Sequence, residues 1–259
     1  MSTTLFLAER RRYILDALKR NGRVAVNELS EAVNVSAVTI RQDLKALEDE
    51  GLLQRTHGGA VEVQLKTSSE IRELSFDIRR NKQTAEKQAI GKAAAALVET
   101  GSAIALDAST TIASLVPALR HFDSLTIVTN NLMVPELVLN TSKIDLHIIG
   151  GRLRRDSYSL IGNPEAVPDM NLKIGFFSAW GISPEAGLTE VNEGEMHMKQ
   201  ALMARCTTKV VLVDSSKWGR VAPYTYAVPS DINLIITTDR APSALLTQFI
   251  GTRIQIVTL

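Results

Sequence analysis

The chain has 259 residues, of which 45% are hydrophobic and 22% charged, and its formal net charge at pH 7 is +1. This composition excludes a wholly disordered chain and fits a globular protein with one large domain or two smaller ones. No apolar run approaches the roughly 20 residues of a membrane-spanning helix, and the N-terminus lacks the positive start of a signal peptide. We therefore expect a cytoplasmic protein.

Cysteine and histidine are too few or too scattered for several kinds of chemistry. The single cysteine, Cys206, excludes an internal disulfide, and its apolar surroundings indicate a buried packing residue. The four histidines form no metal-ligand pattern with it. We expect no metal and no other cofactor. Because the chain is nearly neutral, its total charge does not indicate a nucleic-acid partner. Only the position of the basic residues can indicate one.

Three regions follow one another along the chain. Residues 1–61 read as three helices and a short hairpin, and residues 62–83 read as a polar, charged linker with a helical turn near residues 71–78. From residue 84 to residue 259, short β-type runs alternate with helical patterns. That alternation predicts βαβ units and a mainly parallel sheet. The fold class is therefore multi-domain, with a C-terminal α/β domain.

The first region has the boundary residues of a helix-turn-helix. A first helix over residues 8–20 ends at Gly22, which can enter the left-handed region, and Asn27 is a good N-cap for a second helix. Asn34 tolerates the left-handed conformation that a tight turn needs, and Ser36 caps a third helix. The short step between the second and third helices is typical of a helix-turn-helix.

The third helix, residues 36–50, divides into two faces. Ile40, Leu44 and Leu47 recur at i, i+4 and i+7 and form one apolar stripe. The opposite face carries amide, guanidinium, ammonium and methyl groups, which are the groups that read base edges in the major groove. The candidate DNA-binding residues of this helix are Ser36, Val38, Thr39, Arg41, Gln42 and Lys45.

A short hairpin follows the third helix directly. Residues 52–63 alternate around Gly58-Gly59, which predicts a hairpin. Arg55 and His57 lie beside its turn, where a wing can reach phosphate, and they complete the candidate DNA-binding residues. Three helices alone would also suit a simple packing unit with solvated charges. The added hairpin favours a winged helix-turn-helix that binds DNA.

The third region contains seven β-type runs with helical patterns before and between them. We expect strands at residues 103–106, 125–128, 145–149, 174–179, 209–213, 234–237 and 253–257. We expect helices at residues 86–98, 111–120, 132–139, 195–206 and 243–250.

Polar and small residues follow most of these strands. Ligands of open parallel sheets bind beyond the carboxyl ends of the strands. A helix start can hold an anion, glycines let the backbone approach a ligand closely, and a lysine supplies a mobile cation. Together these features suit a phosphorylated polyol. Each loop taken alone has a common structural explanation as a cap or a turn, but five at one sheet edge favour a site. The candidate effector-binding residues here are Asp107, Ser109, Thr110, Thr111, Asn130, Gly150, Gly151, Gly181 and Lys217.

Both folded regions resemble the DeoR family of bacterial regulators. In the first region the resemblance lies in residues 35–44, 47–53 and 55–60. In the second it lies in residues 107–111, 129–130, 150–151, 187–189 and 214–217, with Glu195 and Lys199 one helical turn apart. The resemblance implies a C-terminal domain similar to ribose-5-phosphate isomerase and sugar phosphates as effectors. It adds Glu195 and Lys199 to the candidate effector-binding residues.

Three positions depart from the family's pattern. Gln42 stands where the family usually has a second Arg, which indicates a different base preference. Ser109 stands where Gly is common, and Trp180 replaces the Asp of a run that is often Gly-Ala-Asp-Gly. We expect Trp180 to alter one wall of the effector pocket, so that the effector is unusual or the pocket is partly filled.

We therefore expect a sequence-specific transcriptional regulator, a repressor of carbohydrate-metabolism genes, with double-stranded operator DNA and a sugar phosphate as partners. Symmetric operators match dimeric proteins, so we expect a homo-oligomer, a dimer or tetramer, held together by the C-terminal domain. The attached DNA module favours sensing without turnover, and we expect no enzyme activity.

Two alternatives stay open. One is a sugar-phosphate isomerase that uses Asp107, Glu195 or Lys217, although Glu195 and Lys199 fit a surface i,i+4 ion pair better than acid–base work. The other is a DNA-binding protein without a small-molecule ligand, whose C-terminal domain only oligomerises.

Overall fold

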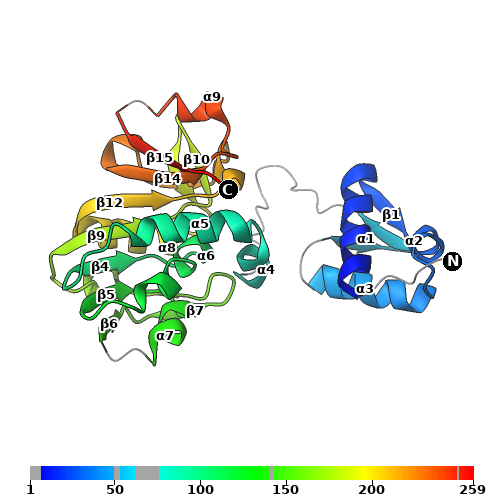
Figure 1. Ribbon diagram of the computed structural model, residues 1–259, viewed down its shortest axis with the longest axis horizontal. Helices are drawn as coiled ribbons and strands as arrows, with labels where there is room; N and C mark the ends of the chain where they lie inside the picture. The colour runs from blue at the N-terminus through cyan, green and yellow to red at the C-terminus, as the bar shows by residue number, and fades with distance from the viewer. Residues whose placement is uncertain (1–6, 50–52, 62–75, 141–142, 250) are drawn as a thin grey trace. The chain divides into compact units, whose positions relative to one another are not determined.

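The computed structural model describes residues 7–49, 53–61, 76–140, 143–249 and 251–259. The chain divides into two compact units, Met1–Ile78 and Arg79–Leu259 (Figure 1). The expected DNA-binding region falls in the first unit and the expected α/β region in the second. Most of the expected linker, residues 62–75, lies outside the described residues.

The first unit contains the three expected helices, α1 (Leu7–Asn21), α2 (Val26–Ala32) and α3 (Ala37–Asp49). Gly22 and Asn34 have φ values of +70° and +50°, as the left-handed positions predicted. Ser36 caps α3, since its Oγ accepts a hydrogen bond from the Thr39 amide at 3.1 Å. The expected N-cap at Asn27 is wrong, because α2 begins one residue earlier and has no side-chain cap.

The hairpin is confirmed and belongs to a small sheet. Strands β1 (Arg23–Ala25), β2 (Gln54–Thr56) and β3 (Gly59–Val61) pair antiparallel in the order β1-β3-β2. The sequence pattern did not predict β1. Gly59 is required at its position because an added Cβ would lie 2.0 Å from the Val24 carbonyl oxygen. Its missing side chain lets the hairpin pack against β1.

The first unit has its own hydrophobic core. Ile40, Leu44 and Leu47, the predicted apolar stripe of α3, are at most 1% exposed, and they pack with Ile14 and Leu18 of α1. This core orients α3 so that its other face is available to solvent.

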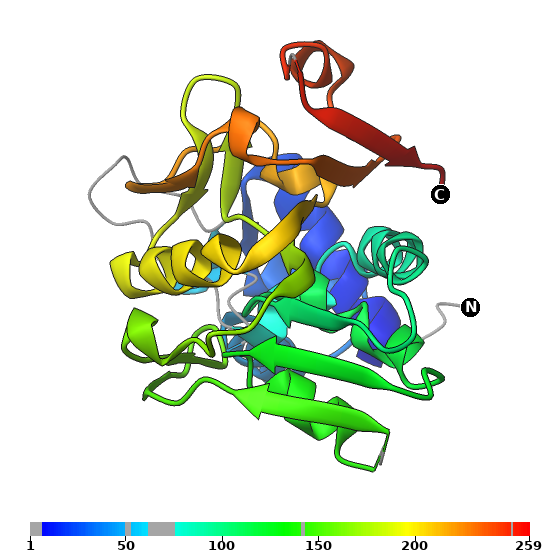
Figure 2. The ribbon, with the colours of Figure 1, turned by 90° about the vertical axis from the view of Figure 1, so that its left-hand side faces the viewer.

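The second unit is built on a seven-stranded sheet in the order β15-β14-β12-β9-β4-β5-β6, in which every neighbouring pair is parallel (Figures 1 and 2). All seven predicted strands occur, and together they make up this sheet. Their bounds are β4 (Ala103–Leu106), β5 (Leu125–Thr129), β6 (Ile144–Ile148), β9 (Leu172–Phe177), β12 (Cys206–Leu212), β14 (Leu234–Thr238) and β15 (Arg253–Val257).

Helices cover both faces of this sheet. In Figure 2, α5 (Thr84–Ala95) lies on one face and α8 (Glu193–Ala204) on the other. The predicted helix at 111–120 is split into α6 (Thr110–Ala113) and a 3₁₀ turn, η1 (Val116–Leu119), because Pro117 cannot continue an α-helix. The other elements are α4 (Phe76–Asn81), α7 (Met133–Val138), α9 (Ser243–Leu246), η2 (Pro164–Ala166), η3 (Ser215–Lys217) and η4 (Pro229–Asp231).

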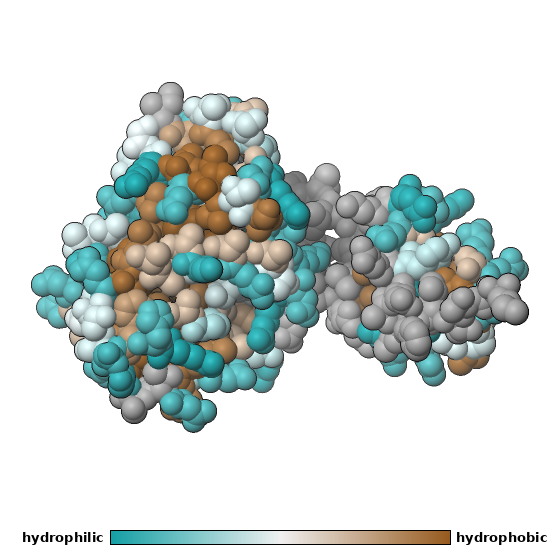
Figure 3. Space-filling view, in the orientation of Figure 1, coloured by the Kyte–Doolittle hydropathy of each residue, from teal (hydrophilic) through white to brown (hydrophobic). Residues whose placement is uncertain are grey.

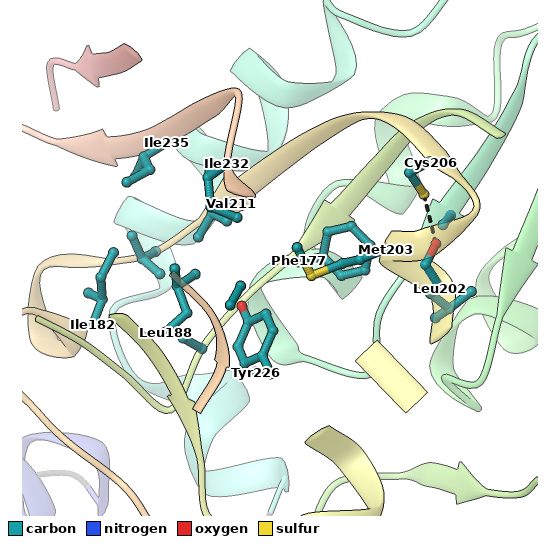
Figure 4. Close-up of a cluster of buried hydrophobic side chains, with 14 of the residues drawn as sticks. Phe177, Ile182, Leu188, Leu202, Met203, Cys206, Val211, Tyr226, Ile232 and Ile235 are labelled. Carbon is teal, nitrogen blue, oxygen red and sulfur yellow. Dashed lines mark hydrogen bonds between the residues drawn. The ribbon is translucent and has the colours of Figure 1, made fainter. Parts of the chain in front are cut away.

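Two hydrophobic clusters fill the two faces. Alternation along β4 sends Ile104 and Leu106 to one cluster and Ala105 to the other. Figure 4 shows part of the second cluster, in which the Cys206 thiol donates to the Leu202 carbonyl oxygen at 3.1 Å. Burial raises the pKa of this thiol to about 12, so Cys206 is the buried packing residue that was expected.

Five short strands in the described part of the second unit were not predicted. They are β7 (Arg152–Arg154) with β8 (Ser159–Ile161), and an antiparallel sheet of β10 (Gly181–Ser183), β11 (Gly187–Glu190) and β13 (Tyr224–Ala227). Each has only three or four residues, which is too short for a periodic pattern. None of the helices in the described ranges has the length and apolarity needed to cross a bilayer.

Replacing Leu44 by Ala should destabilise the first unit by about 2–5 kcal/mol, because it leaves a cavity in a closed core. Val38→Ala, at a position 60% exposed on the same helix, is the matched control and should change little. Hydrogen exchange of the α1 and α3 amides in the full-length protein measures both. Equal protection in the two variants would show that the stripe is not the core.

Candidate functional site

The outward face of α3 presents the side chains that the sequence placed there. Val38 is 60% exposed, and Arg41, Gln42 and Lys45 are exposed as well. Thr39 is half-buried, and its hydroxyl lies 2.9 Å from the Ser36 Oγ at the cap. The face therefore offers a methyl-bearing group, an amide and two cations to solvent, as the helical angles predicted.

The buried Asp43 holds α1 against α3. Its carboxylate accepts a hydrogen bond from the Arg10 Nε, and the Arg11 Nε lies 3.6 Å from its other oxygen. Sequence reasoning missed this contact. Two arginines of α1 therefore contact Asp43 and help to orient α1 relative to α3.

The wing is tied to the end of α3 by Glu48. The Arg55 amide donates to Glu48 Oε1 at 2.8 Å, and the Arg55 guanidinium lies 3.8 Å from Oε2. This contact partly neutralises the acidic end of α3, whose carboxylates would otherwise repel phosphate. His57 is exposed at the hairpin turn.

A cavity lies beyond the carboxyl ends of the large sheet. The strand order reverses between β4 and β9, which is the topological switch point at which ligands of such sheets bind. Loops after both strands form its walls. The lining residues are Arg79, Ala108, Ser109, Thr110, Thr111, Ser178, Ala179, Trp180, Glu190, Glu195 and Lys217.

A buried charge cluster lies beneath this cavity. The Lys199 ammonium forms an ion pair with Asp107 and lies 3.2 Å from Glu190 Oε1. It also donates to the Ser178 carbonyl oxygen at 2.6 Å, while the Ser178 amide donates to Asp107 Oδ2 at 2.7 Å. Burial opposes the charge on Lys199, but Asp107 and Glu190 outweigh it and raise the pKa of the ammonium.

Glu195 has separate partners. Its carboxylate lies 2.9 Å from Arg154 Nη1 and accepts from the Ser159 Oγ at 2.8 Å. Burial opposes ionisation, but Arg154, Lys199 and the hydroxyls of Ser157 and Ser159 together outweigh it and lower the pKa of Glu195. Glu195 and Lys199 are both buried and are paired with different residues. The interpretation of these two as a surface i,i+4 ion pair is therefore wrong.

The loop after β4 contributes hydroxyl groups. The Ser109 Oγ accepts from the Ile112 amide at 3.1 Å, so Ser109 is the N-cap of α6. Because α6 has only four residues, its dipole is small and the expected helix-start anion site is weak. What this loop offers the cavity is the side chains of Thr110 and Thr111.

Lys217 is the cation opposite this loop. Asp214 caps the η3 turn that carries it, accepting from the Ser216 amide at 3.0 Å. Burial lowers the pKa of Lys217, Asp214 opposes that shift, and Arg79 and Arg220 add to it. The Lys217 ammonium makes no hydrogen bond or ion pair with any residue that the structure describes.

The end of α4 is fastened by a buried lysine of α5. Lys87, which is 4% exposed, donates from Nζ to the Lys82 carbonyl oxygen at 2.6 Å and to the Arg79 carbonyl oxygen. Burial lowers the pKa of Lys87 to about 8. Asp214 and Glu86 oppose that shift, and Lys217 and Arg79 add to it. The chain is thus anchored at the first residues of the second unit.

Six predicted residues do not line the cavity: Asp107, Asn130, Gly150, Gly151, Gly181 and Lys199. The Asn130 amide donates to the Leu160 carbonyl oxygen at 3.1 Å. A Cβ at Gly151 would lie 2.4 Å from the Ile161 backbone, and one at Gly181 would lie 2.3 Å from the Arg220 carbonyl oxygen. Packing of the chain against itself therefore accounts for these two glycines.

Two charged cavity residues were missed from the sequence. Arg79 belongs to a charged run that read as linker, and no pattern distinguishes it from Arg80. Glu190 directly follows the run at 187–189, which was noted only for its resemblance. Within the described ranges, no cluster of three or more His, Cys, Asp or Glu side chains could hold a metal ion.

Two family models match the chain. The DeoR-like helix-turn-helix domain covers residues 10–65, and the DeoR C terminal sensor domain covers residues 82–239. The chain belongs to the DeoR family. This membership confirms the resemblance drawn from the sequence. The second unit is accordingly the sensor domain of this DeoR-family chain.

Curated relatives match over almost the full length. The HTH-type transcriptional regulator GolR of Listeria innocua is 34% identical over 247 residues, covering 95% of this chain and 96% of that protein. The HTH-type transcriptional repressor GlcR of Bacillus subtilis is 31% identical, covering 92% and 91%. The DeoR-family chain is therefore a DNA-binding transcriptional regulator, not an enzyme.

The sensor domain is also similar to a sugar-phosphate enzyme. Ribose 5-phosphate isomerase A from Methanocaldococcus jannaschii matches with a TM-score of 0.38 and 19% identity, over 51% of this chain and 53% of that one. A similarity this weak gives no information about activity. The predicted fold class, a winged helix-turn-helix followed by an α/β domain with a parallel sheet, is confirmed by the DeoR domains and the strand order.

Replacing Lys199 by Met should destabilise the sensor domain by about 3–5 kcal/mol, because two buried carboxylates lose their cation. Lys173→Met removes an exposed ion pair with Glu99 and is the control, which should change little. Urea unfolding followed by fluorescence of Trp180 and Trp218 measures both. A Lys199→Met variant as stable as Lys173→Met would contradict the role given to this cluster.

The free energy of unfolding should contain a contribution from Lys87 that rises between pH 8 and pH 10.5. The pKa of Lys87 is about 8 in the folded protein against 10.5 ordinarily, so the unfolded chain binds more protons in this interval. Lys87→Met should show a smaller rise than the parent. Lys92→Met, exposed on the same helix, should keep the full rise. Identical slopes in the parent and Lys87→Met would refute the assignment.

Proposed function

We propose that this protein is a repressor of carbohydrate-metabolism genes whose affinity for operator DNA changes when a sugar phosphate binds the sensor cavity. The observation that carries the proposal is that Lys217 lines the same cavity as the hydroxyl-bearing Thr110 and Thr111. Lys217 is half-buried and forms no salt bridge with the residues that the structure describes. Such a cation beside hydroxyl donors suits a phosphate monoester.

The remaining walls suit a polyol. Glu190 and Glu195 offer carboxylate oxygens that can accept from sugar hydroxyls. Trp180 forms a flat wall, and the Arg220 guanidinium lies over its ring at 5.7 Å from the centroid. This aromatic wall supports the expectation that the pocket differs from that of other family members. Asp107 and Lys199 act beneath the cavity as its support.

The names of relatives support repression. GlcR and the CsqR protein of Escherichia coli are both named as transcriptional repressors. A further relative, 31% identical, is named a putative aga operon transcriptional repressor. Repression by this chain fits a winged module that binds its operator when the sensor is in one ligand state.

The domain assignment that we propose follows the sequence. Residues 1–61 bind DNA, residues 62–83 connect the two functions, and residues 84–259 sense the effector and oligomerise. Base contacts come from Arg41 and Gln42, and phosphate contacts from Lys45 and the wing residues Arg55 and His57. The protein acts in the cytoplasm, where its operator and effector both occur.

The sensor domain also offers a surface for a second copy. β15 is an edge strand, and Ile256 and Leu259 are 53% and 45% exposed. Figure 3 shows apolar surface at this end of the domain, over the region where Figure 1 places β14 and β15. An exposed strand edge beside apolar surface is suited to pairing between subunits. We therefore propose a homo-oligomer, a dimer or tetramer.

Arg41→Ala should weaken binding to selected operator DNA by about 1–3 kcal/mol and relax base choice at one position. Lys45→Ala should weaken binding to all sequences. Arg20→Ala, exposed on α1, is the charge-matched control. The measurement is fluorescence anisotropy with DNA selected from a random library by the full-length protein. Parent-like affinity in both α3 variants would place the reading surface elsewhere.

Lys217→Ala and Thr110→Val should each weaken binding of the effector by roughly tenfold, since each removes a donor to its phosphate. Thermal shift of the full-length protein with pentose and hexose phosphates, and with the matching free sugars, measures this. Lys92→Ala, exposed on α5, should behave like the parent. If no sugar phosphate stabilises the parent more than its free sugar does, the sensor function proposed here fails, and a ligand-free role of the C-terminal domain is favoured.

A further inference from the structure

We infer that Arg79, on α4, binds the anionic group of the effector together with Lys217, so that the ligand directly holds the residue at which the chain enters the sensor domain. This inference rests on the proposed function and deepens it. It explains how ligand binding in the cavity affects the segment that leads to the DNA-reading module.

The first support is the position of Arg79. Its side chain lines the same cavity as Lys217, although α4 precedes the sheet and η3 follows β12. The other charged lining residues are the acids Glu190 and Glu195, which are paired with Lys199 and Arg154. Within the described lining, the cationic residues are Arg79 and Lys217.

The second support is the mutual repulsion of the cations. Arg79 adds to the burial that lowers the pKa of Lys217, and both of them add to the burial that lowers the pKa of Lys87. Three positive groups are thus close enough to destabilise one another. An anion bound between Arg79 and Lys217 relieves this repulsion. A guanidinium is the side chain best suited to two parallel hydrogen bonds with a phosphate.

The third support is the anchoring of α4. The Arg79 carbonyl oxygen accepts from Lys87 Nζ, and the Arg79 Nη2 donates to the Asp156 carbonyl oxygen at 3.0 Å. Arg79 is also the first residue of the second compact unit. The same residue therefore faces the cavity through its side chain and is fastened to α5 through its backbone.

The regulatory consequence follows from these contacts. Binding an anion favours the charged form of Lys87 and strengthens its two hydrogen bonds to the end of α4. The ligand thus favours the anchored state of α4 over a released one, and a ligand can shift an equilibrium only through such a differential interaction. In the sequence, α4 directly follows the segment that leads to the DNA-reading module.

Arg80 supplies a matched control. It lies next to Arg79 on α4, has the same charge, is exposed, and is not among the lining residues. Arg79→Lys tests geometry, because it keeps the charge and removes the planar fork. A purely structural role for Arg79 would alter stability without altering the response to phosphate.

The experiment uses the full-length parent, Arg79→Ala, Arg79→Lys and Arg80→Ala. Each is titrated with inorganic phosphate and with the pentose or hexose phosphate that most stabilises the parent. Affinity is measured by calorimetry, and amide hydrogen exchange is measured over residues 76–87. We expect Arg79→Ala to bind the phosphorylated sugar about tenfold more weakly or worse, and Arg79→Lys to be intermediate. The phosphorylated sugar should slow exchange over α4 in the parent and Arg80→Ala, but not in Arg79→Ala.

Three outcomes are distinguishable. The pattern just described supports the inference. If the parent and Arg79→Ala bind the phosphorylated sugar equally, or exchange over α4 is unchanged by it in the parent, the inference is overturned while the proposed effector site stands. If no phosphorylated sugar binds the parent, both the proposed function and this inference are overturned.

Discussion

The sensor domain depends on one buried ion pair, between Asp107 and Lys199. Asp107 follows β4, Lys199 lies in the middle of α8, and the Ser178 backbone after β9 bonds to both. The pair therefore fastens the two strands on either side of the switch point to the helix that covers them. Buried charges of this kind contribute modest net stability, but removal of one partner is costly. Such a pair specifies the arrangement of the loops around the cavity more than it stabilises the fold.

This arrangement separates the support of the site from its surface. Asp107 and Lys199 form an ion pair next to the cavity, and Arg154 pairs with Glu195, which lines it. The cavity then presents hydroxyls, carboxylate oxygens and the cations Arg79 and Lys217. In the proposed function, the pairing of the acids reduces their repulsion of an anionic ligand, which the two cations attract.

The sequence predicted the parallel sheet well, because its inner strands are largely buried apolar runs, although the edge strands β6 and β15 are partly exposed. It also predicted α3, because a stripe such as Ile40, Leu44 and Leu47 defines both the core face and the exposed one. It could not predict the burial of Glu195 and Lys199, since the same i,i+4 spacing occurs on solvated helices. Arg79 was missed for a related reason, because a charged run has the same composition whether or not one member turns inward. The roles of Gly151 and Gly181 needed the neighbouring backbone, which lies far away in the sequence.

The strand order has a consequence for synthesis of the chain. β4 pairs with both β5 and β9, so one wall of the cavity is complete only after residues 172–177 have been made, and η3 comes later still. The three-helix module is made long before that, and its contacts are local. Folding during translation therefore completes the DNA-reading module first and the sensor domain last. Translation that stops between them would release a DNA-reading module without its sensor domain. Rapid proteolysis of such fragments would then protect the operator from unregulated binding.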